Sequence, residues 1–70
     1  MAEILAPMSG NIWKILVNQG DTVTEEQEIL IMEAMKMEIP VTATKDGKLV
    51  SLKVKEGDPV EADTVLAVVE

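Results

Sequence analysis

The sequence predicts an all-β domain, a small barrel or sandwich of short strands, built from two copies of one pattern. Shifting the chain by 37 positions aligns residues 1–33 with residues 38–70 without a gap. Identical pairs recur through both copies: Ala6 with Ala43, Gly10 with Gly47, Val17 with Val54, Gly20-Asp21 with Gly57-Asp58, Val23 with Val60, and Glu33 with Glu70. The regular spacing of these glycines is typical of short strands joined by tight turns. The 70 residues are too few for a second core, so we predict a single domain over residues 1–70.

Alternating side chains predict a strand after Gly10 and an equivalent strand after Gly47. We expect six apolar residues at alternate positions to face the core: Trp13, Ile15, Val17, Val50, Leu52 and Val54. The residues expected to point outward are Lys14, Asn18, Ser51 and Lys55, together with Leu16, whose counterpart in the second copy is Lys53. A Gly-Asp pair follows each strand, and glycine there supplies the positive φ of a turn.

Residues 25–37 favour a helix by propensity alone, because Glu, Gln, Leu, Met and Ala dominate the segment. Two observations favour strands instead. Apolar residues recur with a period of two from Ile29 to Ala43, interrupted only at Glu33. The second-copy counterpart of Glu28–Glu33 is Val65–Glu70, which is rich in β-branched residues and too short for a good helix. We therefore predict strands at Glu28–Glu33 and Met37–Thr42, joined by a tight turn that carries Lys36.

The residues Ala34-Met35-Lys36-Met37 lie between the two copies and belong to neither. A tight turn built from Met and Lys lacks the Gly, Asn or Asp that tolerates positive φ, so we expect mild backbone strain there. The ordinary interpretation of Lys36 is a solvated surface lysine that pairs weakly with Glu33 and Glu38. Its unique place in a duplicated fold instead suggests a scaffold that presents this lysine, with Met35 and Met37 forming a surface that another protein reads.

Composition excludes several classes of function. The chain has no cysteine and no histidine, which removes disulfides, thiolate nucleophiles, zinc-thiolate sites and the usual general base near neutral pH. Thirteen acidic against six basic residues give a net charge of −7, which argues against nucleic acid and favours partners with basic docking surfaces. No apolar run long enough to span a membrane and no secretory leader is recognised, so we expect a soluble, cytoplasmic protein without a membrane partner.

The chain resembles the biotinyl/lipoyl carrier domains. Ala34-Met35-Lys36-Met37, flanked by Glu33 and Glu38, matches the biotin-attachment motif of biotin-dependent carboxylases. The similarity extends to Ala6-Pro7-Met8-Ser9-Gly10, to Gly20-Asp21-Thr22-Val23, and to Gly47 and Gly57, and so covers the whole chain. The resemblance implies a flattened barrel, or sandwich, of two four-stranded antiparallel sheets with internal quasi-twofold symmetry. It also implies that Lys36 lies on an exposed hairpin tip, at the far end from both termini.

The resemblance further implies a swinging-arm carrier. A biotin protein ligase would join the biotin carboxyl group to Lys36 as an amide, reading the flanking Glu33, Ala34, Met35, Met37 and Glu38. The carrier would then shuttle carboxybiotin between a biotin carboxylase and a carboxyltransferase. An exposed lysine is an ammonium ion at neutral pH, so the ligase must supply the base and the activated acyl group. We therefore expect a monomeric carrier that is a substrate of the ligase and not an enzyme, with no catalytic residue and no metal.

The family usually has a glycine three residues after the valine of each Gly-Asp turn, where this chain has Glu26 and Asp63. These departures put the geometry of both turns in question. Most relatives are also domains of larger chains, whereas this sequence begins and ends at the domain edges, so we expect a free-standing carrier.

Two other functions compete with biotin carriage. Lipoyl domains place their lysine on the same hairpin but typically flank it with Asp-Lys-Ala, so lipoic acid on Lys36 is the nearest alternative. An unmodified acidic adaptor that docks through its charge and its methionines is a second. An enzyme in its own right is least supported, because no base, metal cluster or catalytic carboxylate pair emerges.

Overall fold

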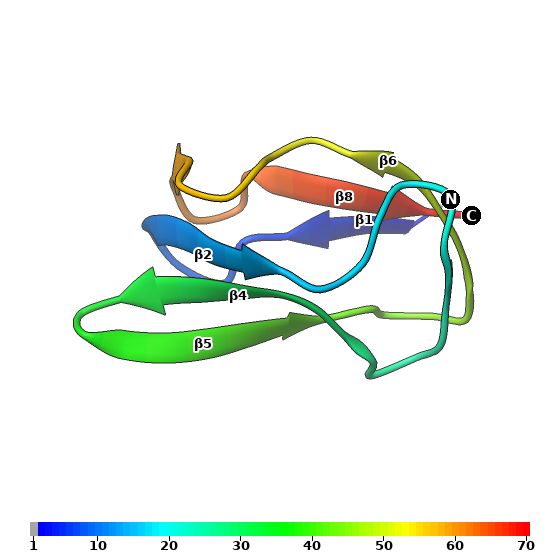
Figure 1. Ribbon diagram of the computed structural model, residues 1–70, viewed down its shortest axis with the longest axis horizontal. Helices are drawn as coiled ribbons and strands as arrows, with labels where there is room; N and C mark the ends of the chain where they lie inside the picture. Colours follow the sequence, from blue (N-terminus) through cyan, green and yellow to red (C-terminus); the bar gives the residue numbers. More distant parts are fainter. Residues whose placement is uncertain (1) are drawn as a thin grey trace.

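The computed structural model describes residues 2–70, which form eight β-strands (Figure 1). The strands are β1 (Ala2–Leu5), β2 (Gly10–Ile15), β3 (Thr22–Val23), β4 (Glu28–Ala34), β5 (Met37–Thr42), β6 (Gly47–Leu52), β7 (Pro59–Val60) and β8 (Val65–Val69). The predicted all-β fold is therefore confirmed, and residues 25–37 contribute a strand and a turn where propensity alone favoured a helix. Among residues 2–70, no helix is long and apolar enough to cross a membrane.

The strands form two four-stranded antiparallel sheets, one in the order β1-β8-β6-β3 and the other in the order β5-β4-β2-β7. Replacing each strand by its equivalent 37 residues away converts one order into the other, which confirms the predicted quasi-twofold symmetry. In Figure 1 the two sheets lie one above the other. The β4–β5 hairpin projects at one end of the molecule, and both chain ends lie at the opposite end.

Hydrogen bonds at the two Gly-Asp turns repeat the symmetry. The N–H of Gly20 donates to the carbonyl of Leu49, and the N–H of Gly57 donates to the carbonyl of Ile12, each at 2.7 Å. Both glycines have positive φ, 98° and 94°, as the sequence predicts. The carboxylate of Asp21 accepts from the backbone N–H three residues earlier at 2.8 Å, and its counterpart in the second copy does the same at 3.0 Å. The carboxylate bonds hold each turn locally, and the glycine bonds attach each turn to a strand of the other copy.

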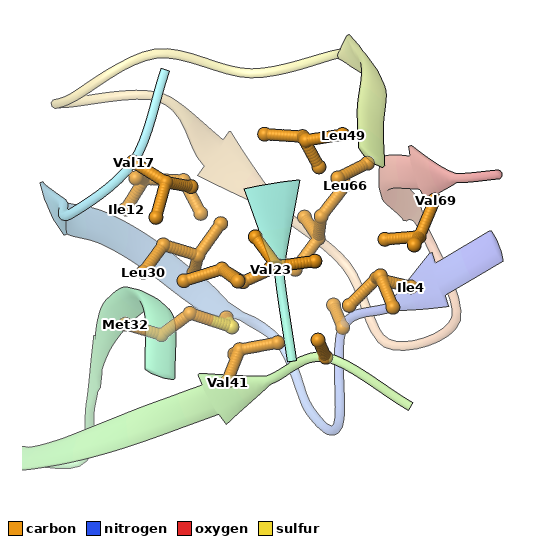
Figure 2. Close-up of a cluster of buried hydrophobic side chains, with 14 residues drawn as sticks. Ile4, Ile12, Val17, Val23, Leu30, Met32, Val41, Leu49, Leu66 and Val69 are labelled. Carbon is orange, nitrogen blue, oxygen red and sulfur yellow. The ribbon is translucent and has the colours of Figure 1, made fainter. Parts of the chain in front are cut away.

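One hydrophobic core fills the space between the sheets (Figure 2). Its largest fully buried side chains are Ile4, Ile12, Val23, Ile29, Leu30, Met32, Leu49, Leu66 and Val69. Among the described residues, no polar or charged side chain is buried. The core is therefore apolar throughout and holds the sheets together by burial of hydrocarbon surface.

The prediction that Trp13 faces the core is wrong. Its side chain is 43% exposed, and the buried residue at this part of β2 is Ile12. A β-bulge between Ile12 and Lys14 places an extra residue opposite β4, so Trp13 and Lys14 are both exposed and the alternation shifts by one residue. The indole lies outside the core, where the Lys14 Nζ atom is 5.8 Å from the centre of the Trp13 ring.

An equivalent bulge lies between Leu49 and Ser51 in β6, so Val50 is only half-buried and Leu49 takes the core position. Beyond the two bulges the predicted facing returns: Val17 is buried, and Ile15, Leu52 and Val54 pack against the core. Of the residues expected to point outward, Lys14, Leu16, Asn18 and Lys55 are exposed, whereas Ser51 is half-buried.

The period of two identifies β4 as a strand but does not show which of its residues face the core. Beyond Ile29, the buried residues of β4 are Leu30, Met32 and Ala34, and Ile31 is only half-buried. Another irregularity, between Glu28 and Leu30 in the pairing with β5, accompanies the burial of both Ile29 and Leu30. The strand prediction therefore holds, but the facing of its first residues depends on pairing that the alternation alone does not reveal.

Candidate functional site

The β4–β5 hairpin ends in a two-residue turn. Glu33 pairs with Glu38 and Ala34 pairs with Met37, which leaves Met35 and Lys36 as the only residues of the turn. Their φ angles are 53° and 64°. Two successive positive φ values are the pattern of a type I′ turn, whose twist matches that of the two strands. The expected strain is therefore present, because neither residue is Gly, Asn or Asp.

Packing at the base of the hairpin fixes the direction in which the turn points. Ala34, the last residue of β4, is only 7% exposed. A Cβ added to Gly10 would lie 3.0 Å from the Ala34 Cβ and 2.6 Å from the Glu33 carbonyl oxygen. Only glycine lets β2 approach β4 this closely. Gly10 is therefore a positioning residue, which the sequence indicated through its match to Gly47 and through its place in the motif shared with the carrier family.

The residues beyond this base extend into solvent. The side chain of Met35 is 85% exposed and that of Met37 is 63% exposed, and Lys36 between them is exposed as well. Glu33 and Glu38 are exposed and lie directly opposite each other across the hairpin. Two like charges facing each other across antiparallel strands destabilise the hairpin slightly. The tip thus combines one amine, two thioethers and two carboxylates, and it carries these groups at the expense of local stability.

The six residues singled out in the sequence all lie on this hairpin, but five of them are exposed and one is buried. Glu33, Met35, Lys36, Met37 and Glu38 are on the surface at or beside the tip, whereas Ala34 packs against the body of the domain. The tip lies at the far end from the chain ends (Figure 1). Among the described residues there is no pocket, and no group of three or more His, Cys, Asp or Glu side chains is placed to hold a metal ion. The candidate site is therefore a projecting side chain that another protein can enclose.

Comparison with known proteins identifies the family. The family model described as Biotin-requiring enzyme, the biotin/lipoyl domain, matches residues 2–69. The biotin/lipoyl attachment protein of Bacillus subtilis (strain 168) is 48% identical over 59 residues, which are 84% of this chain and 81% of that protein. The biotin carboxyl carrier protein of Streptococcus mutans is 49% identical over 57 residues, or 81% of this chain and 44% of that protein.

Among solved structures, the urea carboxylase of Kluyveromyces lactis matches with a TM-score of 0.93 and 38% identity over 99% of this chain, but only 6% of that one. A single-chain long-chain acyl-CoA carboxylase shares the fold, with a TM-score of 0.88 and 21% identity over 94% of this chain and 7% of that one. Several relatives are thus much longer proteins, of which this chain spans a small part. With a family match over nearly its full length, the chain belongs to the biotin/lipoyl attachment domains of biotin-requiring enzymes.

Proposed function

We propose that this protein is a carrier that receives biotin on the Nζ atom of Lys36 and moves a carboxyl group between two enzymes. The observation that carries the proposal is the position of Lys36 at the tip of a two-residue turn, exposed, between two exposed methionines. The tip lies at the opposite end of the molecule from the N and C labels of Figure 1.

The residues present fit a covalently held biotin. An exposed primary amine can form an amide with the biotin carboxyl group, and the exposed turn allows a ligase to enclose it on several sides. When bound, biotin supplies a ring nitrogen that takes up and releases a carboxyl group. Lys36 contributes the flexible tether, and Ala34 and Gly10 hold the base of that tether rigid. The activated biotin acyl group comes from the ligase, so in this proposal the chain is the ligase's substrate.

A tethered group meets a second active site by a local search at raised effective concentration. The proposed partners are a biotin protein ligase, a biotin carboxylase and a carboxyltransferase. A relative from Mycobacterium leprae, 45% identical over 64 residues, is the alpha3 subunit of a biotin-dependent acyl-coenzyme A carboxylase, and this chain spans 11% of it. We propose that the present chain acts as a monomer in the cytoplasm, where ATP for the carboxylation step is available. The acidic charge of −7 favours basic docking surfaces on these partners.

The test is the intact mass of the protein purified from a biotin-replete host, compared with that of Lys36→Arg. Arg keeps the positive charge but lacks the primary amine, so we expect the parent chain to carry one biotinyl group and the variant to carry none. Both proteins should have the same melting temperature, because the side chain at position 36 is exposed. A parent chain that carries no adduct, or a variant that still carries one, would refute the proposal.

Lipoic acid on Lys36 is a second candidate, favoured by one observation: the Bacillus subtilis relative, which this chain nearly spans, is a biotin/lipoyl attachment protein. The same exposed amine serves either amide. Biotinyl and lipoyl groups add different masses, so the intact mass separates the two. Incubating the unmodified chain with a purified biotin ligase, and separately with a purified lipoate ligase, measures which group is transferred faster. We expect transfer of biotin to be faster because Met35 and Met37 flank the lysine.

A further inference from the structure

Two of the chain's methionines are unusually exposed, and they flank Lys36. Met35 is 85% exposed and Met37 is 63% exposed, whereas Met32, only three residues before Met35, is 0% exposed in the core. Met8 is half-buried in the loop between β1 and β2. The molecule therefore exposes two thioether side chains to solvent beside the amine and buries that of Met32 in the core.

The exposed pair contributes nothing to the core. Neither Met35 nor Met37 belongs to the core cluster, nor to the partly buried residues packed against it. Met35 also occupies a positive-φ position, at 53°, where Gly, Asn or Asp would be less strained. Large apolar side chains held in water at a strained turn are explained best by contact with another protein. On the proposed function, that protein is the ligase that loads Lys36.

Exposure also makes these sulfurs accessible to peroxides. A peroxide transfers one oxygen atom to the thioether: the O–O bond breaks, an S=O bond forms, the sulfur loses two electrons, and the second oxygen leaves as water or as the alcohol. The sulfoxide is polar and chiral, so an apolar contact surface becomes a polar one. Sulfoxide reductases reverse the change by using a dithiol, which is oxidised to a disulfide as water is released.

We propose that Met35 and Met37 are reversible oxidation sites, and that their sulfoxides block the loading of Lys36. The inference rests on the proposed function and adds a way of regulating it. Under peroxide stress the domain stays folded, but newly made carrier is not loaded with biotin and so takes no part in carboxylation. Oxidation leaves the core intact because the buried Met32 is out of reach of the oxidant.

The test treats the unmodified chain with hydrogen peroxide, maps the added oxygen by peptide mass spectrometry, and then measures the rate of biotin transfer by a purified biotin ligase. We expect Met35 and Met37 to be oxidised before Met8 and well before Met32. The loading rate should fall about tenfold, the usual effect of removing a strong apolar contact from an interface. The melting temperature should stay unchanged. Methionine sulfoxide reductase with dithiothreitol should restore the original rate.

The matched control is the double variant Met35→Leu with Met37→Leu, which keeps two apolar side chains of similar volume without the reactive sulfur. Peroxide should leave its loading rate unchanged. An oxidised parent chain that is loaded at the original rate, or a lost rate that the reductase does not restore, would overturn the switch. Failure of the untreated parent chain to accept biotin would instead refute the proposed function, so the two failures are distinguishable.

Discussion

At the level of single residues, the non-glycine residues with positive φ occupy two different kinds of position in the described part of the chain. Met35 and Lys36 are adjacent and form the hairpin tip. Glu26 and Asp63 lie 37 residues apart, at equivalent turns of the two copies, with φ of 70° and 67°. The N–H of Glu26 donates to the carbonyl of Ala43 at 2.8 Å, and the N–H of Asp63 donates to the carbonyl of Ala6 at 2.9 Å. The usual glycine geometry of these turns is therefore kept although glycine is absent.

Replacing these two residues by glycine should stabilise the domain. Left-handed backbone strains a residue with a Cβ, and glycine relieves the strain but loses more conformational entropy on folding. We expect Glu26→Gly to raise the free energy of unfolding by about 0.5–1 kcal/mol, and Asp63→Gly by less, because Asp tolerates this region better. Urea denaturation measures both. The control Glu25→Gly, at the adjacent exposed residue outside the positive-φ set, should lower the stability; a rise there of equal size would contradict the explanation.

The methionines give a second prediction at the residue scale. Met35→Ala and Met37→Ala should change the free energy of unfolding by less than about 0.5 kcal/mol, since both side chains are exposed, but should slow biotin transfer. Met32→Ala should instead cost about 2–5 kcal/mol, because it leaves a cavity in the core. Thermal unfolding and a ligase assay on the three variants separate recognition from packing. If Met35→Ala or Met37→Ala unfolds the domain, the description of the tip as a recognition surface is wrong.

At the level of elements, the β4–β5 hairpin sets the position of the Lys36 amine. The pairs Glu33–Glu38 and Ala34–Met37 close the turn and leave Met35 and Lys36 as its two positions. Both positions have a similar positive φ, so a non-glycine residue is strained to a similar degree at either of them. Backbone strain therefore does not explain why the lysine occupies position 36 and the methionine position 35. We expect the ligase to require the amine at position 36.

Exchanging the two turn residues, Met35→Lys with Lys36→Met, tests this point. The variant has the same composition, charge and exposed side chains, so we expect its melting temperature to match that of the parent chain. Biotin transfer should be lost, because the amine moves to the neighbouring turn position and a small misplacement of a reacting group costs orders of magnitude in rate. Intact mass after incubation with biotin ligase and biotin provides the measurement. Loading at the parental rate would mean that the ligase reads only the presence of a lysine on the hairpin.

The bulges in β2 and β6 are the second feature at this scale. They occur at equivalent places in the two copies, between Ile12 and Lys14 and between Leu49 and Ser51. Bulges bend a strand and increase its twist, which helps a small sheet wrap around a core. The duplicated bulge is therefore part of the repeated pattern, and it moves Trp13 to the surface in one copy and Val50 toward the surface in the other.

At the scale of the whole molecule, the two copies are interleaved. Strands β1 and β3 of the first half pair only with β8 and β6 of the second, and β5 and β7 of the second half pair only with β4 and β2 of the first. Within either half alone, a single pairing remains, β2 with β4 or β6 with β8. The duplication thus produces one interleaved unit, and the hairpin that carries Lys36 pairs one strand of the first half with one of the second.

Peptides of residues 1–33 and 38–70 should each be unfolded in isolation. A two-stranded ribbon is marginally stable at best in water, and each half also loses the apolar partners that cover its core face. Circular dichroism and thermal melting of each peptide, with the intact chain as the control, are the measurements. A cooperative melting transition in either peptide alone would contradict the interleaved description.

The sequence by itself determined the all-β class, the two equivalent halves, the positive φ of the Gly-Asp turns and the turn that carries Lys36. These features depend on patterns that are local in the sequence or that occur in both copies, so one sequence is enough to predict them. Only the tertiary structure decided that Trp13 lies outside the core, that Leu30 and Met32 form the inner face of β4, and that Ala34 packs against Gly10. The physical reason is that a bulge and a close approach arise from the register between strands distant in the sequence. Alternation along one strand carries no information about that register.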